Sequence, residues 1–334
     1  MTAAAPDPER LARALARVLG PVTVDGMRRL SGGASRETWA LDACSAGGAR
    51  HELVLRRDPG GHAGSTSRAT EYDVLCSAHA AGVAAPEPVL LLEPGDGLGD
   101  GFVMRRVAGE TIARKILRDE EFAAARAGLA QQCGEQAARI HRIDVATVAT
   151  STLQVLGARE QLAQYRGVLD ALGEPHAAFE LGLRWLDENV PVPSDGQPRL
   201  VHGDFRNGNL VVGPDGLRAV LDWELAHLGD PVEDLGWLCV KSWRFGATDR
   251  PVGGFGDYTT LLDAYAAAGG GRVELDALRY WEAFGTLKWG VICAMQATLH
   301  TSGRVRSVEL AALGRRVAEM EWDLLALLDE LARG

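Results

Sequence analysis

Three side chains between Leu200 and Trp223 have the chemistry that phosphoryl transfer needs. Asp204 can orient an attacking hydroxyl and accept its proton, while Asn209 and Asp222 offer the hard oxygen ligands that Mg²⁺ prefers. Asp204 and Asn209 are five residues apart. In phosphoryl-transfer loops, this spacing lets an Asp face the nucleophile while an Asn turns back to a metal ion. The sequence therefore predicts a catalytic loop followed by a metal-binding strand.

A β-hairpin is predicted directly after this loop. The apolar runs Asn209–Val212 and Leu217–Leu221 are joined by Gly213-Pro-Asp-Gly216, a turn in which Pro presets one dihedral and Gly supplies another. A hairpin would bring Asn209 near Asp222. Each of these residues, taken singly, is more often a turn or cap residue than a ligand. The ordered set with a hairpin inside it favours catalysis.

Composition excludes several classes of protein. The 334 residues are 46% hydrophobic and 24% charged, as in ordinary globular proteins, and the net charge of −10 argues against a general nucleic-acid binder. Five scattered cysteines indicate reduced thiols rather than disulfides or a zinc site. There is no secretory signal pattern and no apolar run of membrane-spanning length. We therefore expect a cytoplasmic enzyme without a nucleic-acid or membrane partner.

The N-terminal third reads as strands. After an amphipathic helix from Pro8, strands over Val22–Leu30 and Glu37–Leu41 flank a glycine-rich loop. Glycines let backbone N–H groups approach anionic oxygens closely, so this loop is a candidate phosphate cover, and a flexible hairpin with no ligand is the alternative. The candidate nucleotide-binding residues in the loop are Ser31, Gly32, Gly33 and Ser35.

The next strand, Glu52–Arg57, places Val54 and Arg56 on one face because side chains alternate along a strand. If Val54 faces a nucleotide, Arg56 does too. Glu71, on a helix predicted over Ser65–Ala81, is the candidate ion-pair partner of Arg56, with a solvated surface glutamate as the alternative.

Strands over Val89–Leu92 and Phe102–Val107 complete a mainly antiparallel sheet, and backbone groups from Arg105 to Val107 are candidates to meet an adenine edge. The remaining chain is mostly helical. The predicted helices are Phe122–Ile143, Leu153–Leu172, Glu174–Glu188, Val232–Trp243, Tyr258–Ala268, Leu275–Leu299 and Val308–Leu331. We expect an α+β chain with a nucleotide-binding lobe at residues 1–106 and a helical catalytic and acceptor-binding lobe at residues 107–334.

These motifs together resemble a known family. Their order along most of the chain is similar to that of the aminoglycoside phosphotransferase and choline-kinase-like enzymes, which have a two-lobed protein-kinase-like fold. The motifs are Leu30-Ser-Gly-Gly-x-Ser, Val54-Leu-Arg56, Glu71, His202-Gly-Asp204, Asn209 and Asp222-Trp-Glu224. The stretch Trp223–Trp237 resembles the branch whose members occur beside, or fused to, acyl-CoA dehydrogenases.

The resemblance implies roles for the residues already singled out. Asp204 would act on the acceptor hydroxyl, Asn209 and Asp222 would hold Mg²⁺ on the phosphates of ATP, and His202 would brace the loop. The implied activity is transfer of the γ-phosphate to a hydroxyl of a small molecule.

One residue departs from the family pattern. The family generally has Lys where this chain has Arg56, whose planar fork has a different reach. A nucleotide-binding scaffold without transfer activity is therefore the alternative function. A protein kinase is disfavoured because no counterpart of an activation segment lies between Asp222 and Val232.

The acceptor stays open at this stage. Seven carboxylates against two arginines between Val201 and Val240 favour a cationic acceptor, whereas the branch resemblance points to hydroxylated acids or their thioesters. Arg206 is placed to meet an anionic group or to form a surface salt bridge. Asp230 and Asp234 read as helix caps. The nucleotide preference, ATP or GTP, and the oligomeric state are also open.

Overall fold

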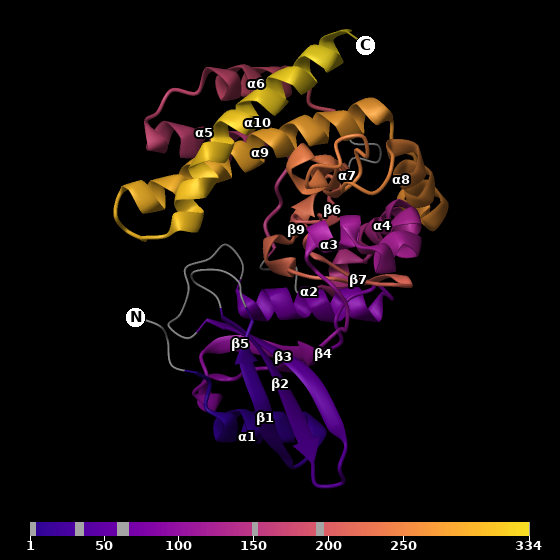
Figure 1. Cartoon of the computed structure of the whole chain (residues 1–334), viewed down its shortest axis with the longest axis vertical. Coiled ribbons are helices and arrows are strands. Elements are labelled where there is room, and N and C mark those ends of the chain that lie inside the picture. Colours follow the sequence, from indigo (N-terminus) through magenta and orange to yellow (C-terminus); the bar gives the residue numbers. More distant parts are fainter. Residues whose placement is uncertain (1–4, 31–36, 59–66, 149–152, 192–196, 334) are drawn as a thin grey trace. The chain divides into compact units, whose positions relative to one another are not determined.

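The computed structural model describes residues 5–30, 37–58, 67–148, 153–191 and 197–333. The chain folds into two compact units. Unit 1 contains residues 1–109, 143–153 and 218–226, and unit 2 contains residues 110–142, 154–217 and 227–334. Figure 1 shows the elements of both units.

Unit 1 is built on a five-stranded antiparallel sheet in the order β1-β2-β3-β5-β4. Its elements are α1 (Pro8–Leu19), β1 (Val22–Arg29), β2 (Glu37–Ser45), β3 (Arg50–Asp58), α2 (Arg68–Ala80), β4 (Pro88–Leu91) and β5 (Asp100–Arg105). Short 3-10 turns lie at Pro94–Asp96, Val145–Thr147 and, as η5, Trp223–Leu225.

The two faces of this sheet differ. Leu53 and Leu55 of β3 pack with Leu11 and Leu15 of α1 in one buried cluster. On the opposite face, the ring of Tyr72 on α2 lies 5.8 Å from that of Phe102, the register partner of Arg56. Strand alternation therefore turns Arg56 toward the α2 face and away from the α1 core.

Unit 2 is mainly helical. Its helices are α3 (Ala113–Arg118), α4 (Ala123–His141), α5 (Ala158–Leu172), α6 (Ala177–Glu188), α7 (Val232–Cys239), α8 (Tyr258–Tyr265), α9 (Leu275–Thr301) and α10 (Val308–Arg333). Shorter turns are the 3-10 segments Glu120–Phe122 and η6 (Lys241–Arg244) and the π-helical Ala266–Gly270. Helices α5, α6, α9 and α10 enclose one core around Phe179, Trp281, Phe284 and Leu324.

Two small sheets frame the predicted catalytic loop. Strands β7 (Leu210–Gly213) and β8 (Gly216–Val220) form the predicted hairpin around Gly213-Pro-Asp-Gly216. Strand β6 (Arg199–Val201) pairs with β9 (His227–Gly229), with Val201 opposite His227. Because β6 ends at Val201, its pairing with β9 fixes the point at which the loop begins. Both strands are too short to show a sequence period.

The predicted α+β class is confirmed, and the errors lie at element boundaries. β2 continues past Leu41, where the predicted strand ends, because Ala43 is buried and pairs with Val24 and His51. Helix α5 begins at Ala158 rather than Leu153, since Val155 instead pairs alongside Leu228. Helix α7 ends at Cys239 and is followed by η6. In the part of the chain that the structure describes, no helix has an apolar window suited to crossing a bilayer.

Gly236 allows α7 to approach α9 closely. A Cβ at Gly236 would lie 2.6 Å from the carbonyl carbon of Trp281 and 2.8 Å from the amide nitrogen of Glu282. Backbone atoms inside a helix cannot move aside without disturbing its hydrogen bonds. We expect Gly236→Ala to lower the free energy of unfolding by about 1–3 kcal/mol, measured by urea denaturation.

The control is Gly167→Ala on the exposed side of α5, where an added Cβ meets no atom within 4 Å. This variant should be slightly stabilised, because Ala is the better helix former. Equal stability changes in the two variants would contradict the close α7–α9 packing.

Candidate active site

A buried carboxylate holds the backbone of the loop that begins at His202. Asp234 of α7 is fully buried, and its Oδ2 and Oδ1 accept the N–H groups of His202 and Gly203 at 2.8 and 2.9 Å. Nε2 of His141 lies 3.0 Å from the same Oδ2. Burial alone raises the pKa of Asp234, but the hydrogen bond and charge of His141, with those of His202, hold it below its ordinary value. Asp234 is thus an anion that anchors the loop.

The outcome for the two predicted caps is therefore mixed. Asp230 accepts the N–H of Val232 at the start of α7, as the cap prediction requires. Asp234 lies inside α7 and binds the loop instead, so the cap prediction is wrong for this residue. The first residues of a helix read alike in sequence whether their carboxylates turn to their own helix or to a neighbouring segment.

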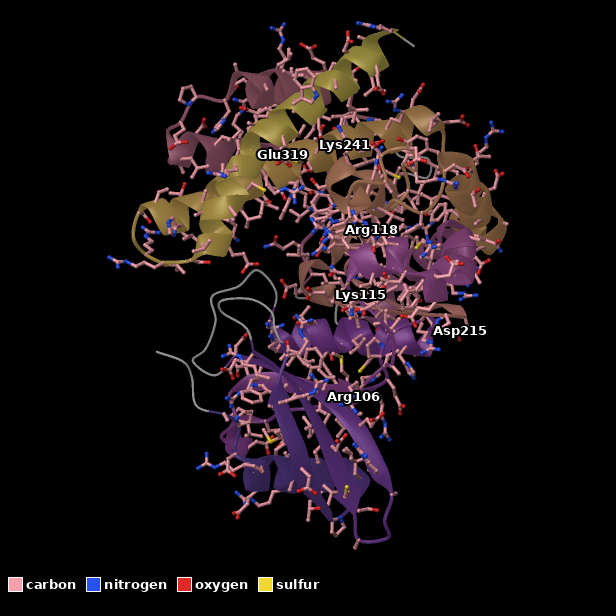
Figure 2. All side chains as sticks on the ribbon, viewed as in Figure 1. Arg106, Lys115, Arg118, Asp215, Lys241 and Glu319 are labelled. Atoms are coloured by element: carbon pink, nitrogen blue, oxygen red, sulfur yellow. The ribbon has the colours of Figure 1, made fainter. Side chains whose placement is uncertain are left out.

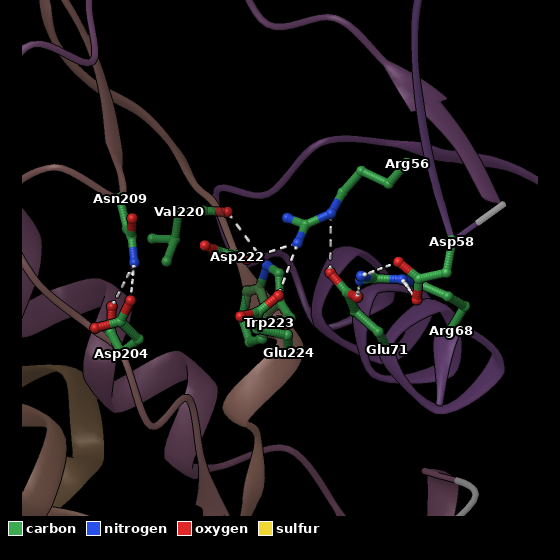
Figure 3. A network of polar contacts seen from close by, with 10 residues as sticks. All are labelled: Arg56, Asp58, Arg68, Glu71, Asp204, Asn209, Val220, Asp222, Trp223 and Glu224. Carbon is green, nitrogen blue, oxygen red and sulfur yellow. Dashed lines mark hydrogen bonds and ion pairs between the residues drawn. The ribbon is translucent and has the colours of Figure 1, made fainter. Parts of the chain in front are cut away.

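Asp204 lies at the centre of the loop and receives three donors (Figure 3 shows the contact with Asn209). Its Oδ1 accepts Nε1–H of Trp237 and Nε–H of Arg206, both at 2.8 Å. Its Oδ2 accepts Nδ2–H of Asn209 at 2.6 Å. Charge-assisted hydrogen bonds of this length fix the carboxylate in one orientation, as a group that positions a hydroxyl must be fixed.

Asn209 closes the loop and keeps its amide oxygen available. Besides the bond to Oδ2, its Nδ2 donates to the backbone oxygen of Asp204 at 2.9 Å, and its N–H donates to the carbonyl of Arg206. Within the described residues, Oδ1 of Asn209 accepts no hydrogen bond. An amide oxygen oriented in this way suits a hard cation.

A buried ion pair between Lys288 and Glu233 contacts the backbone of the loop. Nζ of Lys288 on α9 donates to the carbonyl of Gly203 and to Oε1 of Glu233, both at 3.2 Å, and lies 4.7 Å from the ring centre of Trp237. Burial lowers the pKa of Lys288, but nearby Tyr165, Glu233 and Asp204 raise it above its ordinary value. Lys288 is therefore a cation that contacts the loop and also the indole that donates to Asp204.

Unit 1 gathers a second charged network around Arg56, also drawn in Figure 3. Nη2 of Arg56 lies 2.7 Å from Oδ1 of Asp222 and 3.1 Å from Oε2 of Glu224, and Nε lies 3.4 Å from Oε1 of Glu71. Glu71 is held in turn by Arg68. Asp222 adopts a left-handed backbone conformation with φ 72°, which is uncommon for a residue other than glycine and recurs at functional sites. The Arg56–Glu71 pair proposed from the sequence is present.

The other predicted nucleotide contacts are only partly described. Ser31, Gly32, Gly33 and Ser35 lie outside the described residues. Val54 shares the sheet face of Arg56 and pairs with Met104. The N–H of Arg105 donates to the carbonyl of Glu87, whereas that of Val107 donates to no group in the described chain.

Comparison with known proteins identifies the family to which the chain belongs. The model of the phosphotransferase enzyme family matches residues 26–274. The chain belongs to the phosphotransferase enzyme family. It is 33% identical to chicken acyl-CoA dehydrogenase family member 11 over 231 residues, 65% of the chain and 28% of that protein. It is 28% identical to mouse acyl-CoA dehydrogenase family member 10 over 202 residues, 58% of the chain and 18% of that protein. The chain thus corresponds to less than a third of the length of these curated relatives.

Solved structures share the fold of the chain. One is a putative aminoglycoside phosphotransferase from Ralstonia eutropha, with a TM-score of 0.77 at 21% identity over 98% of this chain and 99% of the other. Another is spectinomycin phosphotransferase APH(9)-Ia in complex with ADP and spectinomycin, with a TM-score of 0.64 at 13% identity over 96% and 98%. The predicted kinase-like fold and the resemblance to aminoglycoside phosphotransferases are confirmed.

Sequence reasoning missed three residues that contact the loop, and it assigned the wrong role to a fourth. Trp237 and Lys288 lie on helices whose apolar period explains them as core residues, and Trp243 lies in a turn. The fourth is Asp234. The only available signal was chemical, because a lysine and an aspartate at buried helix positions need partners.

Glu233 provides a pH test of the support under the loop. Burial raises its pKa, but the charges of His227 and Lys288 lower it from 4.5 to about 2. A lowered folded-state pKa stabilises the protein above the unfolded value, and this contribution is lost as the pH falls toward 2. We expect about 2 kcal/mol of the stability to disappear through this group between pH 6 and pH 3.

Urea unfolding of Glu233→Gln across that range should show a shallower acid dependence than the wild type and lower stability at pH 7. The control, Glu180→Gln, removes an exposed carboxylate that pairs with Arg166 and should keep the wild-type slope. An unchanged slope in Glu233→Gln would show that the carboxylate is not held ionised in the folded protein.

Proposed function

We propose that this protein is an ATP- and Mg²⁺-dependent phosphotransferase that moves the γ-phosphate to a hydroxyl of a small molecule. The observation that carries the proposal is the fixed carboxylate of Asp204, which three donors orient on a loop anchored by Asp234. Phosphoryl transfer demands positioning and charge neutralisation more than covalent chemistry, and a fixed acceptor for the hydroxyl proton meets that demand.

Asn209 and Asp222 are the proposed magnesium ligands. An amide oxygen and a carboxylate form the hard-oxygen donor set that Mg²⁺ takes alongside nucleotide phosphates, and Oδ1 of Asn209 is turned away from the bonds its Nδ2 makes. When bound, the ion would neutralise charge on the phosphate oxygens. The chain's own contribution is to hold Asn209 against Asp204 and Asp222 against Arg56.

The nucleotide is proposed to bind to the lobe formed by residues 1–106. Ser31, Gly32, Gly33 and Ser35 would cover the phosphates, and Arg56, held by Glu71, would contact them. Val54 and the backbone from Arg105 to Val107 would contact the base. The N–H groups of Arg105 and Arg106 already donate to Glu87 and Glu52. The N–H of Val107 donates to no group among the described residues, so it is the donor proposed for the base. Related folds solved as ADP, ATP or GDP complexes point the same way.

Residues 107–334 are proposed to form the catalytic and acceptor-binding lobe. The curated relatives carry acyl-CoA dehydrogenase names, which favours a hydroxylated acid or its thioester over an aminoglycoside as the acceptor. A cytoplasmic location agrees with the five cysteines, all of which are free thiols.

A nucleotide-binding scaffold without transfer activity is the second candidate. It is favoured by one observation: the guanidinium of Arg56 occupies Oδ1 of Asp222, a proposed metal ligand, at 2.7 Å. Magnesium-dependent ATP binding with no turnover on any hydroxyl compound would identify this function.

Replacing Asp204 tests the transfer reaction. Asp204→Ala should lower kcat on the acceptor by about 10²–10⁴-fold, since the hydroxyl loses the group that orients it, while the affinity for MgATP changes little. Radiolabelled phosphate transfer and nucleotide titration measure the two effects. The control Asp170→Ala removes an exposed carboxylate of α5 and should be fully active. Wild-type turnover in Asp204→Ala would remove this residue from the mechanism.

Trp237→Phe tests whether the orientation of Asp204 matters. The variant keeps an aromatic ring beside Lys288 but loses the N–H donated to Oδ1. We expect kcat to fall about 10–100-fold, as for one hydrogen bond to a charged group, with the KM for ATP unchanged. Trp185→Phe, whose ring stacks on Tyr280, is the matched control. A change in KM alone would show that Trp237 acts on binding rather than on the reacting group.

A further inference from the structure

A basic cavity lies in unit 2 among three elements that are distant in sequence. It measures about 950 Å³ and is lined by α3, the Lys241–Thr248 segment and α10. Its charged side chains are four basic and two acidic, namely Arg114, Arg118, Lys241, Arg316, Glu319 and Asp323. Figure 2 labels one from each element, Arg118, Lys241 and Glu319. A cationic excess here contrasts with the chain's net charge of −10.

Two of the cations have no partner among the described residues. Lys241 pairs with Asp323 at 2.6 Å, and Arg316 lies 3.5 Å from Glu319. Arg114 and Arg118, one helical turn apart on α3, are exposed and form no ion pair or hydrogen bond with any residue that the structure describes. Two guanidinium groups side by side repel each other, so an anion between them would be bound favourably.

Three buried hydrogen-bond donors lie near one wall of the cavity, and one of them, on Arg316, belongs to a lining residue. The indole Nε1 atoms of Trp243 and Trp289 are buried and find no hydrogen-bond acceptor among the described residues, and the buried Nε of Arg316 has only the carboxylate of Glu319 nearby, at 3.5 Å. The two indole rings are 4.9 Å apart, and Arg316 donates through Nη2 to Ser242, the residue before Trp243. Of the three, Arg316 lines the cavity, and its guanidinium is a donor only, which suits a ligand rich in acceptor oxygens.

The cavity is connected to Asp204 through one short turn. Lys241 and Ser242 of η6 line the cavity. Trp243, the next residue of the turn, carries the guanidinium of Arg206 at 4.4 Å from its ring centre, and Nε of Arg206 binds Asp204. The turn that lines the cavity is therefore linked to the proposed catalytic carboxylate through two side-chain contacts, Trp243–Arg206 and Arg206–Asp204.

We propose that this cavity binds the anionic group, a carboxylate or a phosphate, of the hydroxyl compound that is phosphorylated. The inference rests on the proposed function and deepens it, since it makes the acceptor an anion. Arg114, Arg118 and Lys241 attract the oxygens, and the indole of Trp322, 72% exposed at the cavity wall, offers an apolar face to the carbon chain of the acceptor. A cationic acceptor is disfavoured by the same charges.

The test compares three small hydroxyl compounds of different charge. Binding of 3-hydroxybutyrate, glycerol 3-phosphate and choline is measured by ligand-observed NMR on the full chain in the presence of MgADP, and phosphate transfer from ATP is recorded in parallel. We expect at least one of the two anions, and not choline, to bind. The anion that binds distinguishes a carboxylate site from a phosphate site.

The variant Arg114→Gln/Arg118→Gln should weaken anion binding tenfold or more, with the affinity for MgADP and the thermal midpoint unchanged, because both side chains are exposed and lack partners among the described residues. Lys115→Gln is the matched control: it lies on the same helix, pairs with Glu110 and does not line the cavity. Its anion affinity should equal that of the wild type.

Binding of choline alone, binding of none of the three, or wild-type anion affinity in the double variant would overturn the proposal. An anion that binds through Arg114 and Arg118 but receives no phosphate would instead count against the proposed function, so the two failures are distinguishable.

Discussion

The buried carboxylate of Asp234 is the constraint on which the candidate site depends. It accepts the N–H groups of two successive loop residues, His202 and Gly203, and so fixes the peptide planes directly before Asp204. The cost of burying this charge is offset by those donors and by His141. Moving any one of these partners away would leave the buried charge of Asp234 uncompensated. The loop backbone at His202 and Gly203 is therefore held in one conformation. Positioning a hydroxyl for transfer needs this rigidity.

Charged and aromatic side chains alternate around the loop that Asp234 holds. Lys288 lies between Glu233, the carbonyl of Gly203 and the ring of Trp237, and Trp237 donates to Asp204. Arg206 also donates to Asp204 and stacks on Trp243. The carboxylate of Asp204 is therefore bound by the indole of Trp237, which lies beside the cation Lys288, and by the cation Arg206, which lies on the indole of Trp243. This arrangement links the orientation of Asp204 to the turn that lines the basic cavity, and hence to the acceptor we propose.

The sequence was informative where the physical signal is local. The long helices follow from apolar periodicity, and the β7–β8 hairpin follows from Gly213-Pro-Asp-Gly216, whose residues preset the turn. Strand alternation placed Arg56 on the face of Val54, but it left Glu71 as either the partner of Arg56 or a solvated surface glutamate, and the structure decides for the pair. The support for Asp204 could not be found this way, because Asp234, Trp237 and Lys288 occupy helix positions that are explained equally well as cap or core. The cavity was also hidden, since it joins Arg118 to Arg316 across nearly two hundred residues.

We propose that Asn209 and Asp222 bind one metal ion on a nucleotide while Asp204 stays free to receive the hydroxyl proton. A crystal structure of the full chain with Mg²⁺ and a non-hydrolysable ATP analogue tests it most directly. The account predicts Oδ1 of Asn209 and a carboxylate oxygen of Asp222 at about 2.0–2.1 Å from the same ion, with Asp204 unligated and facing the terminal phosphate. An ion held by other residues, or a nucleotide bound away from Asp204, would contradict it.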